Sequence, residues 1–543
     1  MIMKAFDFVI VGAGSAGCVL ADKLSEDGKY QVCLIEAGPK DKHWSIHLPL
    51  GIIDLMKSKT LNWQFNSTNE QSQNNRAIFN PRGRTLGGSS SINAMLYIRG
   101  QRQDYDYWDE LGNKGWSFDE VLPYFKAVEH QERGPDEYHG VGGQLNIADS
   151  RSKPIIQDRF ISAAHQAGYP LNNDFNGSSQ EGIGYYQLTQ KGGQRCSAAK
   201  AFLTPNLSRK NLTVITDAHV NKLLIKDKQA YGVNFTIKGV EQEVFAKKEV
   251  LLSAGAFNSP QILMLSGIGA KDELTKHNIK VKHELTGVGQ NLQDHVDALV
   301  VSKHTHDELL AYRPKALAWF IRESLKYFTL PFSKNTDRKG LLTSVVAEAG
   351  GFIKANEQSS RPDFQLHFIP GAMDDHGRNH KMLLNYGVSL HICLLRPESR
   401  GEVKLLGNDP RLEPAITLNM LSHKHDQEQM IKAVKIARTI LNQTPLKENN
   451  LAELSPGEHV QSDEDILKFL KAKANTIYHP VGTCKMGKDS LAVVDEQLKV
   501  HGISNLRVVD ASIMPTLISG NTNAPTIMIA SKAAEMILEA HCN

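Results

Sequence analysis

Phe6-Asp-Phe-Val-Ile-Val11, followed directly by Gly12-Ala-Gly-Ser-Ala-Gly17, is the stretch of sequence that decides the fold of this chain. The first six residues are apolar enough for a buried strand, and apolar residues between 16 and 24 recur at helical spacing beyond the glycines. Val32-Cys-Leu-Ile35 predicts a second buried strand. A strand–helix–strand order of this kind predicts a parallel sheet that is covered on both faces.

The three glycines of the turn have the spacing of a dinucleotide-binding motif. Gly12 would allow the tight turn, Gly14 would let backbone approach a pyrophosphate, and Gly17 would permit close helix–strand packing. The N-terminus of the following helix would present free N–H groups to the phosphates. Glu36 lies 19 residues after Gly17, at the end of the second strand, where its carboxylate can accept hydrogen bonds from ribose hydroxyls. A tight turn without a ligand is the alternative interpretation, and the motif does not distinguish FAD from NAD.

A glycine–serine segment, Gly83-Arg-Thr-Leu-Gly-Gly-Ser-Ser-Ser-Ile-Asn93, bears on that choice. Successive small residues let a loop lie flat against a planar ring system, with N–H groups free to point at its polar edge. A second unusual stretch runs from Gly255 to Gly269 and follows the strand-like Val250-Leu-Leu-Ser-Ala254.

At these two stretches the chain resembles the glucose–methanol–choline oxidoreductases, a family of flavoproteins. The resemblance covers essentially the whole chain and includes Asn291-Leu-Gln-Asp-His295. Within the family, the combination is most similar to bacterial alcohol dehydrogenases that use an acceptor other than oxygen, with choline dehydrogenase a near neighbour. The segments Ile46-His-Leu-Pro-Leu-Gly51 and Leu61-Asn-Trp63 contribute to that similarity.

The resemblance implies noncovalent FAD and a set of residues that hold it. The implied contacts are Gly12, Gly14, Ser15, Gly17 and Glu36 at the nucleotide; Arg84, Gly87, Gly88, Ser89, Asn93 and Met95 around the flavin; Val220 near the adenine; and Asp510, Ala511, Asn521 and Thr522 near the C-terminus. Some relatives attach flavin through a histidine just before the asparagine of the glycine–serine loop. Ile92 occupies that position here, and isoleucine has no nucleophile, so attachment there is excluded.

Thr476-Ile-Tyr-His-Pro-Val-Gly-Thr-Cys-Lys-Met-Gly487 contains the expected base. Oxidation of an alcohol requires a group that takes the hydroxyl proton, and a pKa near working pH favours histidine. Pro480 biases His479 toward extended backbone, which suits a loop end that presents its ring. A hydrogen-bonded core histidine is the alternative, and the resemblance implies that His479 is the base.

The second catalytic candidate lies in Ile518-Ser-Gly-Asn-Thr-Asn-Ala-Pro-Thr-Ile-Met-Ile-Ala530. Pro525 suits the first turn of a helix. The resemblance places a histidine or asparagine that faces the substrate oxygen just before this helix, and we assign that role to Asn523. An amide takes no proton at neutral pH, so His479 would act alone as base. Asn521 is the competing candidate, and simple helix capping is the alternative for both. The helix dipole would favour an anionic reduced flavin if its N-terminus faced the ring.

Length and pattern predict two structural regions, because single cores stop growing at roughly 250–300 residues and the chain has 543. We expect an α/β protein in which a Rossmann-like FAD-binding domain with a parallel sheet joins a substrate domain with an antiparallel sheet and helices. The FAD-binding domain would be discontinuous, over 1–155, 195–298 and 480–543, and the substrate domain would span 156–194 and 299–479.

A formal charge of +3 gives no reason to expect nucleic acid as a partner. The six scattered cysteines, the lack of a secretory cleavage pattern and the lack of a long apolar run favour a cytoplasmic protein, with peripheral contact at the inner face of the membrane left open. Asp374–His380 and His423-Lys-His425 carry metal-ligand residue types, but lack paired ligand spacing, so we expect solvated segments and no metal.

These observations predict an FAD-dependent dehydrogenase that oxidises a primary alcohol to an aldehyde and passes the electrons to a quinone or similar carrier. Choline oxidation and an oxidase that uses oxygen are the alternatives. A lyase that keeps FAD for structure and splits cyanohydrins is a remote one. The sequence leaves the particular alcohol and the oligomeric state undetermined.

Overall fold

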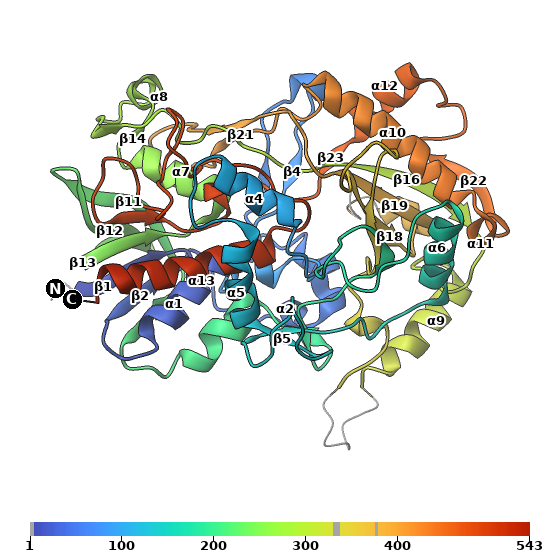
Figure 1. Ribbon diagram of the computed structural model, residues 1–543, viewed down its shortest axis with the longest axis horizontal. Helices are drawn as coiled ribbons and strands as arrows, with labels where there is room; N and C mark the ends of the chain where they lie inside the picture. The colour runs from blue at the N-terminus through green and yellow to red at the C-terminus, as the bar shows by residue number, and fades with distance from the viewer. Residues whose placement is uncertain (1–4, 329–336, 375–377, 379, 543) are drawn as a thin grey trace.

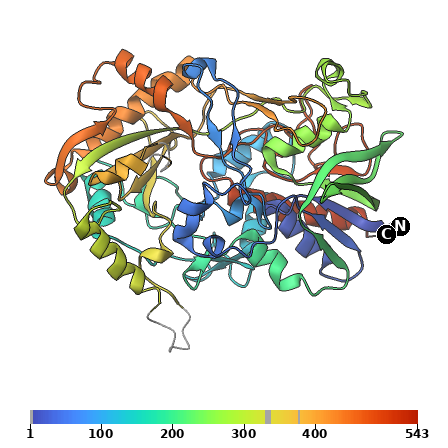
Figure 2. The same cartoon turned by 180° about the vertical axis from the view of Figure 1, so that it is seen from behind.

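The computed structural model describes residues 5–328, 337–374, 378 and 380–542, and it contains two seven-stranded sheets. Figures 1 and 2 show the two sheets in separate lobes that lie side by side. The lobe of the first sheet contains the N-terminal strands, a middle segment and the C-terminal helix, so three stretches distant in sequence build it (Figure 1).

The first sheet contains the predicted strand–turn–helix unit. Its strands are β1 (Ala5–Val11), β2 (Val32–Ile35), β10 (Leu212–Ile215), β11 (Ala218–Lys226), β12 (Gln229–Ile237), β13 (Val240–Leu252) and β24 (Leu506–Val508). The order β10-β2-β1-β13 is parallel throughout, and β24 also pairs in parallel with β13. β12 and β11 extend the sheet in antiparallel fashion. The prediction of a Rossmann-like parallel sheet is confirmed, with an antiparallel addition at one edge.

Helices α1 (Ser15–Ser25) and α13 (Asn523–Ala540) pack against each other beside this sheet. Gly17 makes the helix–strand approach possible, because a Cβ atom there would lie 1.9 Å from the carbonyl oxygen of Gly12. The buried apolar face of α13 continues into the same core, as expected for a helix that is covered on nearly all sides. Both helices start at the lobe boundary, where β1 also ends (Figure 1).

The second sheet is antiparallel throughout. Its strands are β7 (Gly182–Tyr185), β16 (Val296–His304), β17 (Ala349–Ile353), β18 (Phe364–Ile369), β19 (Gly387–Leu394), β22 (Asn450–Ser455) and β23 (Asn475–Thr476). Contacts with this lobe come from α6 (Ile155–Gln166), α10 (Lys424–Leu441), α11 (Thr444–Lys447) and α12 (Asp463–Lys473). Every residue of β17, β18 and β19 is buried. The predicted antiparallel sheet with helices is confirmed.

The remaining elements connect and flank the lobes. The helices are α2 (Trp44–His47), α3 (Ile52–Leu55), α4 (Arg102–Glu110), α5 (Phe118–Val128), α7 (Gly255–Leu265), α8 (Lys271–Lys276) and α9 (Pro314–Leu325). The short strands are β3 (Phe65–Asn66), β4 (Phe79–Asn80), β5 (Glu129–Gln131), β6 (Leu145–Ile147), β8 (Gln190–Lys191), β9 (Gln194–Arg195), β14 (Ile268–Gly269), β15 (His283–Glu284), β20 (Glu402–Lys404) and β21 (Ala415–Thr417). Within the described residues, no helix has both the length and the apolar character that crossing a bilayer requires.

The strands of the first sheet all fall within the segments predicted for the FAD-binding domain. Those of the second fall within the predicted substrate domain, except that β16 starts at Val296. The domain boundaries themselves stay a prediction. Residues 375–377 and 379 of the Asp374–His380 segment lie outside the described residues.

Candidate functional site

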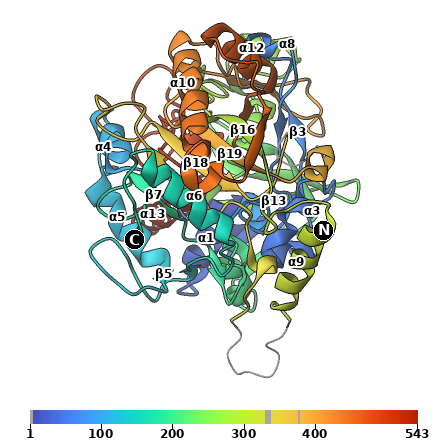
Figure 3. The same ribbon diagram turned by 90° about the vertical axis from the view of Figure 1, so that its right-hand side faces the viewer.

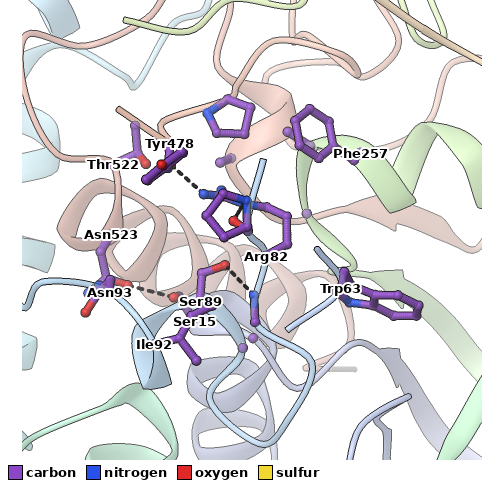
Figure 4. Close-up of a pocket in the computed structure, with 18 of the residues that line it drawn as sticks. Ser15, Trp63, Arg82, Ser89, Ile92, Asn93, Phe257, Tyr478, Thr522 and Asn523 are labelled. Atoms are coloured by element: carbon purple, nitrogen blue, oxygen red, sulfur yellow. Dashed lines mark hydrogen bonds between the residues drawn. The ribbon is translucent and has the colours of Figure 1, made fainter. Parts of the chain in front are cut away.

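A deep cavity lies between the two lobes, where β1 and β2 end and α1 and α13 begin. Its lining combines the predicted motifs, several of which Figure 4 shows, with His367 and Ile369 of β18 and His391 of β19. Predicted residues on the wall are Gly12, Gly14, Ser15, Glu36, Gly88, Ser89, Asn93, Met95, Val220, His479, Asp510, Ala511, Asn521, Thr522 and Asn523. Motifs that are separated by hundreds of residues therefore meet at one site.

The glycine turn forms one end of the cavity. Gly12 has a φ of +96°, and a Cβ atom there would lie 2.5 Å from the carbonyl oxygen of Ser253, so no other residue fits without a shift. Gly14 differs, because no heavy atom of the described chain lies within 4 Å of the place where its Cβ atom would be. The backbone of Gly14 thus faces open cavity, which is the cradle that a pyrophosphate needs.

Glu36 closes the same end of the cavity. Its Oε2 atom accepts a hydrogen bond of 2.9 Å from the N–H of Ala13, and its Oε1 atom accepts one of 2.8 Å from Gly38. Burial raises the pKa of Glu36 to about 7, while these two bonds act in the opposite direction. Each carboxylate oxygen keeps a second lone pair, which is available to a ribose hydroxyl.

The glycine–serine loop packs directly against the glycine turn. The N–H of Gly87 donates to the carbonyl oxygen of Ala13 at 2.7 Å, and a Cβ atom on Gly88 would lie 2.7 Å from the Cα atom of Gly14. Ser89 Oγ accepts a hydrogen bond of 3.1 Å from the N–H of Gly83 (Figure 4). The two motifs therefore form one wall, as the small side chains allow.

Three predicted cofactor residues, Gly17, Arg84 and Gly87, lie behind the cavity wall rather than on it. Gly17 and Gly87 lie where neighbouring atoms leave no room for a side chain. The guanidinium of Arg84 stacks over the ring of Trp63 at 4.8 Å, and Trp63 itself lines the cavity. The buried Nε atom of Arg84 has no hydrogen-bond partner among the described residues. The open cradle at Gly14 and the N-terminus of α1, which both line the cavity, fit a bound dinucleotide.

His479 lines the cavity on the side of the second sheet, across from the glycine turn and the glycine–serine loop. Its Nδ1 atom lies 3.0 Å from Nδ1 of His295, and its Nε2 atom lies 3.1 Å from Nδ2 of Asn521. His295 Nε2 lies 3.1 Å from the carbonyl oxygen of Ile518. A carbonyl oxygen can only accept, so His295 carries its proton on Nε2 and accepts at Nδ1. His479 must then donate from Nδ1, which leaves a lone pair on Nε2.

Burial keeps both rings neutral. It is the largest cause that lowers the pKa of His479 well below its usual value, and nearby His295, His367 and Arg82 act in the same direction. Burial also lowers the pKa of His295 to about 4. At neutral pH each ring therefore has one donor and one acceptor, and the assignment of tautomers above holds.

Gln365 of β18 fixes the amide of Asn521. Its Nε2 atom donates a hydrogen bond of 3.0 Å to Asn521 Oδ1, so the N–H group of that amide turns toward His479. The chain of hydrogen bonds thus runs with one polarity from Gln365 through Asn521, His479 and His295 to the carbonyl group of Ile518.

The two asparagines differ in their contacts. Asn523 Oδ1 accepts a hydrogen bond of 2.7 Å from Ser15 Oγ at the start of α1, although Asn523 also lines the cavity (Figure 4). The structure brings Asn521, rather than Asn523, to the imidazole of His479. Which of the two asparagines faces the substrate oxygen stays a prediction, and the contact with His479 favours the competing candidate, Asn521.

Backbone contacts hold the base in place. The N–H of His479 donates to Oδ1 of buried Asp294 at 2.9 Å, and Arg82 Nη2 donates to the carbonyl oxygen of Tyr478 at 2.6 Å (Figure 4). No role at the site was expected from the sequence for Arg82, Asp294, His295 or Gln365. The motif that contains Asp294 and His295 was visible, but nothing in it indicated a contact with residue 479.

Comparisons with known proteins identify the family of the chain. The N-terminal model of the GMC oxidoreductases matches residues 6–297, and the C-terminal model matches residues 397–530. The chain is 47% identical over 540 residues to an alcohol dehydrogenase [acceptor] from Pseudomonas putida, with 98% of this chain and 96% of that protein covered. It is 42% identical over 543 residues to the mitochondrial choline dehydrogenase of Mus musculus, with 98% and 89% covered.

Solved structures show the same fold. Pyridoxine 4-oxidase from Mesorbium loti superimposes with a TM-score of 0.87 at 30% identity, with 99% of both chains covered. A variant of formate oxidase from Aspergillus oryzae, whose structure concerns FAD modification, gives 0.90 at 29% identity with the same coverage. The chain is therefore a two-lobed oxidoreductase with the architecture of a flavoenzyme. It belongs to the GMC oxidoreductase family, whose members and structural neighbours support FAD as the cofactor.

Proposed function

We propose that this protein oxidises a primary alcohol to an aldehyde with noncovalently bound FAD and passes the electrons to a quinone-type acceptor. The observation that carries the proposal is the lone pair on His479 Nε2, which lies at the cavity beside the amide of Asn521. When bound in the cradle formed by the glycine turn and the glycine–serine loop, FAD supplies the hydride acceptor. The similarity to the Pseudomonas putida alcohol dehydrogenase [acceptor] supports the type of substrate and acceptor.

In the structure the amide N–H of Asn521 donates to the lone pair on His479 Nε2, so the substrate hydroxyl group would replace that hydrogen bond. The hydroxyl proton would be donated to His479 Nε2, and the hydroxyl oxygen would accept a hydrogen bond from Asn521 Nδ2. As the proton moves to the imidazole, negative charge develops on the substrate oxygen, and the preorganised amide stabilises it. His295 keeps accepting from Nδ1 throughout, so the ring of His479 does not need to turn.

The charges around the cavity favour a neutral alcohol. Among the described residues that line it, the carboxylates are Glu36 and Asp510, and both contact backbone of the first lobe. Asp297 in the second lobe is fully buried, and its oxygens lie 2.7 Å from His391 Nδ1 and 3.1 Å from Cys393 Sγ. Within the part of the chain that the structure describes, a trimethylammonium group would therefore meet no open carboxylate on the substrate side.

Anaerobic flavin reduction tests the proposal. Bleaching of the 450 nm absorbance band would be followed in stopped flow with straight-chain primary alcohols, aromatic alcohols and choline. His479→Ala should slow reduction by at least ~100-fold, the low end for a general base. His479→Gln should be equally slow, because it keeps a hydrogen-bonding side chain but offers no base. Equal flavin content in all variants would show that the fold and the cofactor site are intact.

Several results would contradict the proposal. Near-normal reduction in either variant would remove His479 from the role of base. Faster reduction by choline than by any neutral alcohol would overturn the substrate class. Stoichiometric peroxide in air without an added acceptor would identify an oxidase, and flavin that stays yellow with every alcohol would favour a lyase.

A further inference from the structure

Helix α9 presents a stripe of apolar side chains to solvent. Leu317, Ile321 and Leu325 follow at four-residue spacing and have relative exposures of 54%, 51% and 56%. Residues four apart share one face of a helix, so the three side chains form a continuous ridge. Phe328, just beyond the helix, extends it with an exposure of 64%. We call these four side chains the α9 ridge.

The opposite face of α9 is packed. Ala316 and Trp319 are buried, and Trp319 belongs to an apolar cluster with Val346, Ala347 and Met373. The last three residues also line the cavity. The ridge is therefore an additional apolar surface rather than a badly placed core face. Contiguous exposed apolar surface of this kind marks a binding surface for a protein or a membrane.

Basic side chains flank the ridge. Arg313 and Lys315 lie at the start of α9, and Arg322 and Lys326 lie near its end. The acidic residue of the helix, Glu323, is mostly covered and is shared by Arg322 at 3.2 Å and Lys326 at 2.6 Å. An apolar face with cations on its flanks is the pattern of helices that lie in the interface of an anionic bilayer.

We propose that the α9 ridge docks this protein on the surface of a lipid bilayer that contains anionic headgroups. A second copy of the chain fits the same surface poorly. A two-fold contact through the ridge would place each patch against itself, so the four basic side chains of one copy would face those of the other. Headgroups of negative charge suit these side chains, and the apolar ridge reaches the boundary of the acyl chains (α9 lies on the outer edge of the molecule in Figures 1 and 3).

The mouth of the cavity lies close to the ridge. Tyr312, two residues before α9, is exposed and lines the cavity, as does Ile53 of α3. The turn at Leu341–Thr343 contacts both α9 and the turn at Pro49–Gly51 that precedes α3. Docking through the ridge would therefore hold the cavity mouth near the bilayer, from which an apolar alcohol or a quinone can enter.

Vesicle sedimentation of the FAD-loaded protein tests the docking surface. The parent should sediment with vesicles of phosphatidylcholine and phosphatidylglycerol, less with phosphatidylcholine alone, and less as salt is added. The variant with Ile321→Glu and Leu325→Glu should lower the partition coefficient at least ~tenfold, because two apolar side chains leave the membrane and two anions replace them. Leu406→Glu is the matched control, since Leu406 is a leucine of 60% exposure far from α9 in sequence.

Three outcomes would overturn the docking surface. The parent stays in the supernatant with both kinds of vesicle, the double variant binds as the parent does, or the control loses binding equally. If the parent does not bind vesicles but forms a dimer, and the double variant is a monomer, the ridge is a contact with a second copy of the chain instead. The sedimentation result is independent of the proposed function. A soluble dye as acceptor should give unchanged alcohol oxidation in the double variant.

Discussion

His295 should control the rate of substrate oxidation without touching the substrate. The change His295→Phe keeps a ring of similar size but removes the acceptor for Nδ1–H of His479. That donor is buried, and a buried donor without a partner costs about 1–3 kcal/mol. The ring can relieve this cost only by moving or by placing its proton on Nε2, where the substrate proton must go. Either response lowers the rate of anaerobic flavin reduction by about 10–100-fold.

The matched variant His295→Gln separates polarity from packing. Glutamine can donate to the carbonyl oxygen of Ile518 and accept from His479, so it should keep reduction within a few-fold of the parent. If His295 served only to pack the core, both substitutions would slow flavin reduction alike and would leave its pH profile unchanged. The reasoning is refuted if His295→Phe, with full flavin content, reduces within threefold of the parent, or if both variants are equally slow.

Three further results follow from the site. Asn521→Ala should slow flavin reduction by about 100-fold or more, as loss of a preorganised donor does, whereas Asn523→Ala should change it much less; the reverse order would show that Asn523 is the residue that faces the substrate oxygen. Because burial lowers the pKa of His479, the acidic limb of the reduction rate should lie below pH 6.5, and a midpoint above that value would contradict it. Gly14→Val should fold with normal thermal stability but without FAD, since the added side chain enters open cavity; a yellow Gly14→Val protein would place the cofactor elsewhere.

The fold was largely predictable because its signals are local. The apolar run before Gly12, the spacing of the glycines and the position of Glu36 are set by residues near one another in sequence, and the parallel strands β1 and β2 formed as expected. The antiparallel edge made by β11 and β12 was not predicted. Both of its pairings are hairpins closed by two-residue turns, Asp227-Lys228 and Lys238-Gly239, so the signal for this edge was local as well and was missed.

A site residue could be predicted only where it lies within a recognisable sequence motif. His479 has a characteristic sequence around it, and the structure places it at the cavity as expected. The choice between Asn521 and Asn523 could not be made from sequence, because only Thr522 separates them and the direction of each side chain depends on Gln365 and Ser15. Those partners come from other elements, hundreds of residues away for Ser15.

The residue that accepts the hydrogen bond from His479 Nδ1 is a neutral histidine and not a carboxylate, and this determines how strong a base His479 is. In serine proteases a buried aspartate accepts from the imidazole and stabilises the imidazolium. Here the acceptor is neutral His295, so protonated His479 gains no opposite charge at Nδ1. The base is consequently weak, and it stays unprotonated well below neutral pH. A weak base that is always available suits a reaction in which loss of the hydroxyl proton is coupled to loss of hydride, because no stable alkoxide has to accumulate. Asn521 then matters most in the transition state, where the oxygen is partly charged and the imidazole has only begun to take its proton.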